Sequence, residues 1–345
     1  MNSLPLSQRS PKWQRVLLGG AAALVALTIG NRAVSRRAER SHPPEGSFIE
    51  IEGVRLHYRD RGTGRPIVLI HGNVVTGDDY DTSGIAERLI RTNRVIIFDR
   101  PGFGHSKRPR GHVWTAAEAE LLHKALARLR VEWPVIVGHS WGTLVALALA
   151  EQHPTDTAGL VLLSGYYFPT PRLNALFVAA VATPVLGDVL RHTVSPPLGR
   201  LLMPLLTRAM FAPAPMTGRF RREYSPAMAL RPSQIKATAD DGALMVPSAI
   251  GLRAHYGELA MPVAIMAGDG DLVVSHRQAE RLHDAIPGST LRIVEGVGHM
   301  IHHVATQEVT ETIQAVTARS SRPAPLPNGE VAVLNVFMER VPEAV

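Results

Sequence analysis

The stretch VIVGHSWGTLVALALAEQHP, residues 135–154, places one serine between two glycines. Its β-branched start is typical of a buried strand, and the run rich in alanine and leucine after it is typical of a helix. Gly138 and Gly142 leave room for a tight turn from strand to helix. Such a turn lifts the hydroxyl of Ser140 above the strand ends, at a helix N-terminus that favours negative charge. The context therefore predicts a nucleophilic serine more strongly than the pentapeptide GHSWG alone.

The composition is that of a globular protein. The chain has 345 residues, of which 45% are hydrophobic and 19% are charged. It contains no cysteine, which excludes disulfides, a thiol nucleophile and cysteine-ligated metals. Residues 1–40 contain seven basic side chains and one acidic side chain, so they carry nearly all of the net charge of +7. A nearly neutral remainder argues against nucleic acid as a partner.

The N-terminal segment, residues 1–40, is predicted to be a single-pass membrane anchor. Residues 16–30 carry no charge. Fifteen helical residues span about 22 Å, less than the ~30 Å hydrocarbon core, but the flanking Trp13, Arg15 and Arg32 can extend the span. A signal segment cleaved after export and a buried helix are the alternatives. The side of the membrane that the rest of the chain faces stays open, because basic residues flank both ends.

The rest of the chain alternates strand-like and helix-like segments. Residues 41–46 form a Pro-rich linker, and the alternating pattern at 47–62 predicts a hairpin around Gly53. Continuous apolar runs, typical of parallel strands buried on both faces, occur at 66–70, 94–99, 134–138, 159–165, 263–268 and 291–296. This order predicts an α/β fold with a mostly parallel, eight-stranded type of sheet and helices on both faces. Capping boxes are expected at the two helix starts Thr115–Glu118 and Ser275–Gln278.

The regular alternation is interrupted once. Residues 166–260 contain no clear core strand and are rich in Pro, Leu, Met and Arg. They are predicted to form a mainly helical lid inserted into a core made of residues 41–165 and 261–319. A second independent domain is the alternative. Residues 320–345 begin Pro-rich and are expected to be loosely attached.

A serine needs a base to become a good nucleophile, and the base is expected to be a histidine held by a carboxylate. His299 follows the last predicted strand, and Asp269 and Asp271 follow the one before it. The order serine, aspartate, histidine is the order expected when these groups occupy the ends of successive strands in such a sheet.

With these residues, the chain resembles the α/β-hydrolase fold superfamily over residues 48–319. In that family the acid ends a G-x-x-D loop followed by an apolar pair, and the sequence GDGDLV at 268–273 matches it. The resemblance therefore selects Asp271 as the catalytic acid. Asp269 is the alternative candidate for the catalytic acid. If it does not have that role, it is expected to cap the turn.

The resemblance also implies two backbone donors for an oxyanion. The segment LIHGNVVTGDDY at 69–80 resembles the family's HG-x loop, which makes the N–H of Asn73 one donor. The residue after the nucleophile, Trp141, supplies the other. His71 and Gly72 are expected to shape the turn. In the loop FDRPGFGHS at 98–106, Asp99 and Arg100 are expected to form a buried structural pair.

The nucleophile decides the chemistry. Asn73 and Trp141 stand where haloalkane dehalogenases of this fold bind halide, but those enzymes use an aspartate nucleophile, as do soluble epoxide hydrolases. Ser140 instead suits acyl transfer. The predicted function is a serine hydrolase that cleaves a carboxylic ester with an apolar part, without a cofactor. Alternatives are a C–C bond hydrolase, a cofactor-free peroxidase or acyltransferase, and a catalytically silent binding module.

The remaining candidates are weaker. The pattern H-x-x-H-H, which ends at His302 and His303, suggests a metal but has no matching carboxylate or thiol pattern, so no metal site is predicted. These histidines are expected to open or flank a helix. The insertion carries a net charge of +5, which suits either a solvated face or contact with anionic lipid. Aromatic candidates for pocket walls are Tyr80, Trp114, Tyr166 and Tyr167.

Overall fold

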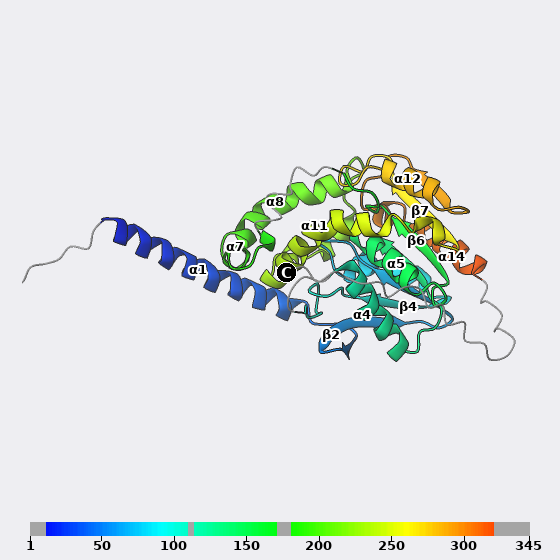
Figure 1. The fold of residues 1–345 in the computed structure, drawn as a ribbon. Helices are drawn as coiled ribbons and strands as arrows, with labels where there is room; N and C mark the ends of the chain where they lie inside the picture. The colour runs from blue at the N-terminus through cyan, green and yellow to red at the C-terminus, as the bar shows by residue number, and fades with distance from the viewer. Residues whose placement is uncertain (1–11, 110–113, 171–180, 321–345) are drawn as a thin grey trace, which may run out of the picture.

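The computed structural model describes residues 12–109, 114–170 and 181–320. Its centre is one sheet of eight strands in the order β1-β2-β4-β3-β5-β6-β7-β8 (Figure 1). The first three strands in this order pair antiparallel, and every other pair is parallel. The predicted α/β fold and the hairpin are therefore confirmed. The strands are β1 (Ser47–Ile51), β2 (Val54–Arg61), β3 (Arg65–Ile70), β4 (Asn93–Phe98), β5 (Val135–His139), β6 (Gly159–Leu163), β7 (Val263–Gly268) and β8 (Thr290–Val294).

Helices cover both faces of this sheet because the central strands are apolar on both sides. In β3, Val68 and Ile70 belong to one buried core and Ile67 and Leu69 to the other. The first core also contains residues of α4 (Thr115–Arg128), α5 (Trp141–Gln152) and α12 (Arg277–Ala285). The second contains residues of α3 (Ile85–Leu89), α13 (Ile301–Val304) and α14 (Thr306–Arg319), and α2 (Asp78–Thr82) contributes Tyr80.

The parallel register aligns the carboxyl ends of the strands. Ile70, the last residue of β3, is opposite Gly138 near the end of β5. Gly268 ends β7 opposite Val294, which ends β8. The loops that follow these strands therefore collect at one edge of the sheet, where open α/β sheets hold their sites.

Both predicted capping boxes are wrong. The N-cap of α4 is Trp114, and the hydroxyl of Thr115 lies 2.6 Å from that of Ser248 instead. The N-cap of α12 is His276. The side chain of Gln278 accepts hydrogen bonds from the backbone N–H groups of residues 167 and 168, so it fixes the start of the insertion after β6. Both polar side chains that would complete a local cap are used in tertiary contacts.

The regular elements in the described part of the insertion between β6 and β7 are helices, joined by irregular segments. It contains α7 (Leu186–His192), α8 (Ser195–Phe211), α9 (Gly218–Glu223), α10 (Pro226–Ala229), α11 (Pro232–Leu252) and the short helix η1 (Tyr256–Glu258). Helix α11 contributes Leu244 and Ala249 to the same core as α5. Of the predicted C-terminal tail, only Ser320 belongs to the described residues.

Helix α1 (Lys12–Ser41) extends away from the body of the molecule (Figure 1). It has 30 residues, and its most apolar window has a mean hydropathy of 1.5. Its length and composition are sufficient to cross a membrane, a property that signal sequences share. Residues 16–30 are exposed except for the half-buried Thr28, whereas Asn31 is buried against α7.

Candidate active site

Ser140 occupies a strained turn between β5 and α5. Its backbone lies at φ 52° and ψ −118°, a conformation that residues other than glycine rarely adopt. A Cβ at Gly138 would lie 2.7 Å from the Cα of Thr143, and one at Gly142 would collide with the carbonyls of Ile70 and His71. The two glycines therefore allow the turn by letting β3 and α5 approach the strand end.

The structure brings the three predicted side chains together. The Nε2 atom of His299 lies 2.9 Å from the Oγ of Ser140, and its Nδ1 lies 2.8 Å from Oδ2 of Asp271. Asp271 and His299 are buried, while Ser140 is partly accessible. A buried carboxylate fixes the ring orientation of the histidine, leaving its other nitrogen to accept a proton from the serine.

The choice between the two aspartates after β7 follows from their contacts. The second oxygen of Asp271 accepts hydrogen bonds from the backbone N–H groups of Val273, at 2.8 Å, and Val274, at 2.9 Å. Asp269 accepts one from the N–H of Gly296, at 2.8 Å, and so ties its own turn to the next loop. Of the two aspartates, Asp271 contacts His299 through its side chain.

The loop after β3 lies directly against the serine. A Cβ at Gly72 would be 3.0 Å from the Cβ of Ser140. The next residue, Asn73, directs its side chain away to the insertion, where its Nδ2 donates to the carbonyl of Thr238 at 3.1 Å. Its Oδ1 accepts from the N–H of Val74. Both polar atoms of the Asn73 side-chain amide are therefore hydrogen-bonded within the protein. Trp141 is buried, and its ring lies near the guanidinium of Arg100.

The polar residues that support this loop are paired differently from the prediction. Asp99 and Arg100 are both buried, but they do not pair with each other. Asp99 accepts hydrogen bonds from His57 Nδ1 and from backbone N–H groups at residues 77 and 105. The Arg100 guanidinium lies 2.7 Å from Glu118 on α4 and 2.7 Å from Asp241 on α11. Each charge is compensated by partners distant in sequence, which the local pattern did not reveal.

His71 is a neutral structural residue. Its Nδ1 donates to the carbonyl of Gly72 at 2.7 Å, and its Nε2 accepts from the N–H of Arg100 at 3.0 Å. Burial and the nearby Arg100 charge lower the pKa of His71 to about 4. The imidazole therefore holds the turn without carrying charge at neutral pH.

His139, the residue before the nucleophile, supports the backbone of His299. Its Nε2 donates to the carbonyl of His299 at 3.0 Å, and the two rings lie 5.0 Å apart between centroids. Burial, followed by the proximity of His302 and His299, holds the pKa of His139 well below its usual range. Sequence reasoning treated this position as the unspecified x of G-x-S-x-G, and no local signal distinguished it.

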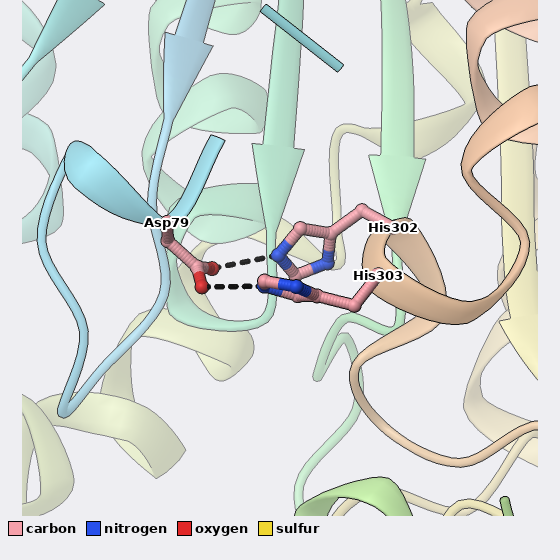
Figure 2. Close-up of side chains that lie close together, drawn as sticks. All are labelled: Asp79, His302 and His303. Atoms are coloured by element: carbon pink, nitrogen blue, oxygen red, sulfur yellow. Dashed lines mark hydrogen bonds and ion pairs between the residues drawn. The ribbon is translucent and has the colours of Figure 1, made fainter. Parts of the chain in front are cut away.

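A buried aspartate links the loop after β3 to the segment after His299 (Figure 2). Asp79 on α2 accepts hydrogen bonds from Nε2 of His302, at 2.6 Å, and Nε2 of His303, at 2.7 Å. Burial would raise the pKa of Asp79, but the two imidazoles outweigh it and hold this pKa well below its usual range. Figure 2 shows both rings pointing at the one carboxylate from α13. Both histidines lie within the short helix α13.

Asp79 is the carboxylate that the H-x-x-H-H pattern lacked. One ligand atom from each of Asp79, His302 and His303 lies within 4.8 Å of the other two. The two ring nitrogens, however, already contact separate oxygens at hydrogen-bond distance. A metal would have to replace both bonds, so we interpret the cluster as a structural link. It positions the loop that carries His299 relative to α2.

None of the four aromatic pocket-wall candidates lines the pocket found between α8 and α9. Tyr80 and Tyr167 are core residues, with the Tyr80 hydroxyl bonded to the Ile70 carbonyl. Tyr166 is buried in the same core as Tyr167, and Trp114 is exposed. That pocket, of about 590 Å³, lies between α8 and α9. It is lined by Met203, Pro204, Thr207, Met216, Phe220 and Tyr224, with Arg200, Arg208 and Arg221 among its other residues.

The chain is similar in sequence to known proteins. The model of the alpha/beta hydrolase fold family matches residues 65–306. An uncharacterized protein of Mycobacterium tuberculosis is 32% identical over 282 residues, which cover 76% of this chain and 77% of that protein. A 2-hydroxymuconate semialdehyde hydrolase of Pseudomonas putida is 34% identical over 155 residues, 45% of this chain and 55% of that protein.

Solved structures agree on the fold. An esterase from Exiguobacterium antarcticum superposes with a TM-score of 0.66 at 20% sequence identity. The match covers 79% of this chain and all of the esterase. Together with the parallel sheet and the serine turn, these matches show that the chain is a hydrolase and that it belongs to the alpha/beta hydrolase fold family.

Proposed function

We propose that the protein is a serine hydrolase that cleaves a carboxylic ester with an apolar part. The observation that carries this proposal is the chain of contacts from Ser140 Oγ to His299 Nε2, at 2.9 Å, and from His299 Nδ1 to Asp271 Oδ2, at 2.8 Å. This geometry is what a general base needs to take the serine proton during attack.

The reaction then follows the usual course of acyl transfer. Ser140 Oγ bonds to the carbonyl carbon while its proton moves to His299 Nε2, and Asp271 stabilises the imidazolium that forms. The N–H groups of Asn73 and Trp141 hold the tetrahedral oxyanion. Collapse breaks the C–O bond to the alcohol, which takes the proton from His299. Water, activated by the same histidine, hydrolyses the acyl-enzyme and restores Ser140.

The insertion supports an apolar substrate. We propose that it acts as a lid, because its helices pack on residues that flank the reacting groups. Phe211 and Phe220 form a buried apolar cluster with Val75 and Met300, which lie two positions from Asn73 and one from His299. The N–H of Met300 also donates to the carbonyl of Met210 on α8, at 3.2 Å.

C–C bond hydrolysis is the second candidate. It is favoured by the likeness to the 2-hydroxymuconate semialdehyde hydrolase of Pseudomonas putida, which reaches 34% identity over 155 residues. Such a reaction would use the same serine, histidine and oxyanion donors. The proposal does not extend to peroxidase or acyltransferase chemistry or to a silent binding module.

Two measurements test the proposal. A fluorophosphonate probe should label the full chain at Ser140, and Ser140→Ala should abolish labelling without altering thermal unfolding. The p-nitrophenyl esters of increasing acyl length should be hydrolysed, with kcat/KM rising over the shorter chains. Labelling without ester turnover at any length would favour the C–C hydrolase, and a folded chain that is never labelled would contradict both.

We also propose that α1 anchors the enzyme in a membrane. The support is its length of 30 residues, its apolar window and the exposure of residues 16–30. Four exposed arginines on its last turns, Arg32, Arg36, Arg37 and Arg40, suit the lipid headgroup region. Carbonate-resistant association of the full chain with membranes, lost on removal of residues 1–30, tests the anchor. Release of a shortened mature chain would instead indicate a cleaved signal.

A further inference from the structure

The described part of the chain outside α1 exposes one concentration of large apolar side chains, on α7 and α8. Helix α8 carries leucines at positions 198, 201, 202 and 205, spacing that places them on one stripe of the helix. This stripe faces solvent, and Leu201 and Leu205 are 76% and 68% exposed. The opposite side of α8, with Met203, Thr207 and Met210, is buried. The helix therefore has a buried face and a second, exposed apolar face.

The exposed face begins where α1 joins the body. The Nδ2 of Asn31 donates to the carbonyls of His192 and Thr193, at 3.0 and 2.8 Å, and its Oδ1 accepts from Arg200 at 3.3 Å. These bonds join α1 to the end of α7 and to α8. Figure 1 shows α7 beside α1 at the point where α1 leaves the body. Arg231 adds an ion pair with Glu39, at 3.0 Å.

The contact of Asn31 with α7 and α8 lies directly after the apolar run of α1. Residues 16–30 are uncharged, and the buried Asn31 follows them immediately. If residues 16–30 lie in hydrocarbon, the contact with α7 and α8 lies at the headgroup level. A helix that exposes leucines at this level can bury them in the outer part of the bilayer, and neighbouring arginines can contact anionic headgroups.

We infer that α7 and α8 form a second membrane contact, which docks the insertion on the bilayer surface beside the α1 span. The docking surface consists of Leu186, Val189, Leu198, Leu201, Leu202 and Leu205. Arg200 and Arg208 are exposed on the same helix and can contact anionic headgroups. The inference rests on the proposed anchoring by α1, and it does not depend on which bond the enzyme cleaves.

The absence of cysteine from the sequence allows a direct test. Single-cysteine variants of the full chain, Leu201→Cys and Leu186→Cys, carry an environment-sensitive fluorophore. They are reconstituted in vesicles of phosphatidylcholine and phosphatidylglycerol, with or without bromine on the acyl chains. Leu24→Cys reports on the α1 span, and Ala127→Cys, on the exposed side of α4, is the aqueous control. Thermal unfolding of each variant checks that it is folded.

The expected result is a blue shift and bromine quenching at residues 24, 186 and 201, and neither at residue 127. Quenching at residue 24 without quenching at 186 and 201 overturns the docking surface and leaves the anchor intact. No quenching at residue 24 overturns the anchor and the docking inference with it. A blue shift at residue 201 that bromine does not quench would show that protein, such as a second copy, covers the surface, and would also overturn the inference.

Discussion

Oδ2 of Asp271 lies 2.8 Å from Nδ1 of His299, whereas the side chain of Asp269, two residues earlier, accepts a hydrogen bond from the backbone N–H of Gly296 in the next loop. This difference gives the first prediction. Asp271→Asn should lower kcat for ester hydrolysis by about 10⁴-fold, because the amide favours the wrong histidine tautomer. Asp269→Asn, the matched control, should cost far less. Steady-state kinetics on one p-nitrophenyl ester decide; comparable losses in both variants would count against the assignment of Asp271.

The second prediction concerns the glycines. At Gly142, an added Cβ would collide with the backbone carbonyls of Ile70 and His71, which cannot move without disturbing β3. Gly142→Ala should therefore destabilise the protein by about 2 kcal/mol and remove probe labelling at Ser140. Gly251 on α11 has open space around it. Gly251→Ala, in the last turn of α11, should raise stability by less than about 1 kcal/mol, because alanine has the higher helix propensity. Denaturant unfolding compares the two, and equal stabilities would contradict the steric account.

The third prediction concerns the link in Figure 2. In Asp79→Asn, the amide accepts one histidine N–H and leaves the other buried and unpaired. The expected loss of stability is about 2 kcal/mol or more. The neighbouring Asp78 is exposed and pairs with Arg59, which also contacts Asp81. Asp78→Asn should therefore cost less than about 1 kcal/mol. If Asp79→Asn unfolds at the same denaturant concentration as the parent, the link does not contribute to the stability of the protein.

The fourth prediction is a pH dependence. The buried His71 has a pKa near 4, whereas an unfolded histidine titrates near 6.5. Between these values the unfolded chain binds the extra proton, so the free energy of unfolding should fall as the pH drops from 6.5 towards 4. The slope from this group reaches about 1.4 kcal/mol per pH unit. His71→Gln should show a shallower slope in urea unfolding across that range; an unchanged slope would reject a neutral His71.

Much of the fold and the reacting group could be predicted from the sequence because the relevant signals are local. The buried strands appear in the sequence as continuous apolar runs. The glycines around Ser140 indicate a tight turn in which a larger side chain would not fit. The strand order placed Ser140, the two aspartates Asp269 and Asp271, and His299 after successive strands, and the family resemblance selected Asp271. None of these inferences required knowledge of how distant segments pack.

The supporting contacts could not be predicted because they depend on tertiary placement. Asp79 and His302 are 223 residues apart in the chain, and Arg100 and Asp241 are 141 residues apart. Asp99 and Arg100 are adjacent, which suggested a pair, yet their side chains reach different partners. Similarly, Glu118 and Gln278 fit a local capping pattern but lie within reach of stronger tertiary partners.

Arg100 pairs with two carboxylates, and these ion pairs fix one helix of the insertion, α11, to the core. Its guanidinium joins Glu118 of the core to Asp241 of α11 in a site without solvent access, and separating such charges is costly. Helix α11 should therefore stay fixed during turnover. Any opening that admits substrate should then come from α7 to α10, which precede α11 in the chain. Hydrogen exchange in the working enzyme should be slow along α11 and faster along α8.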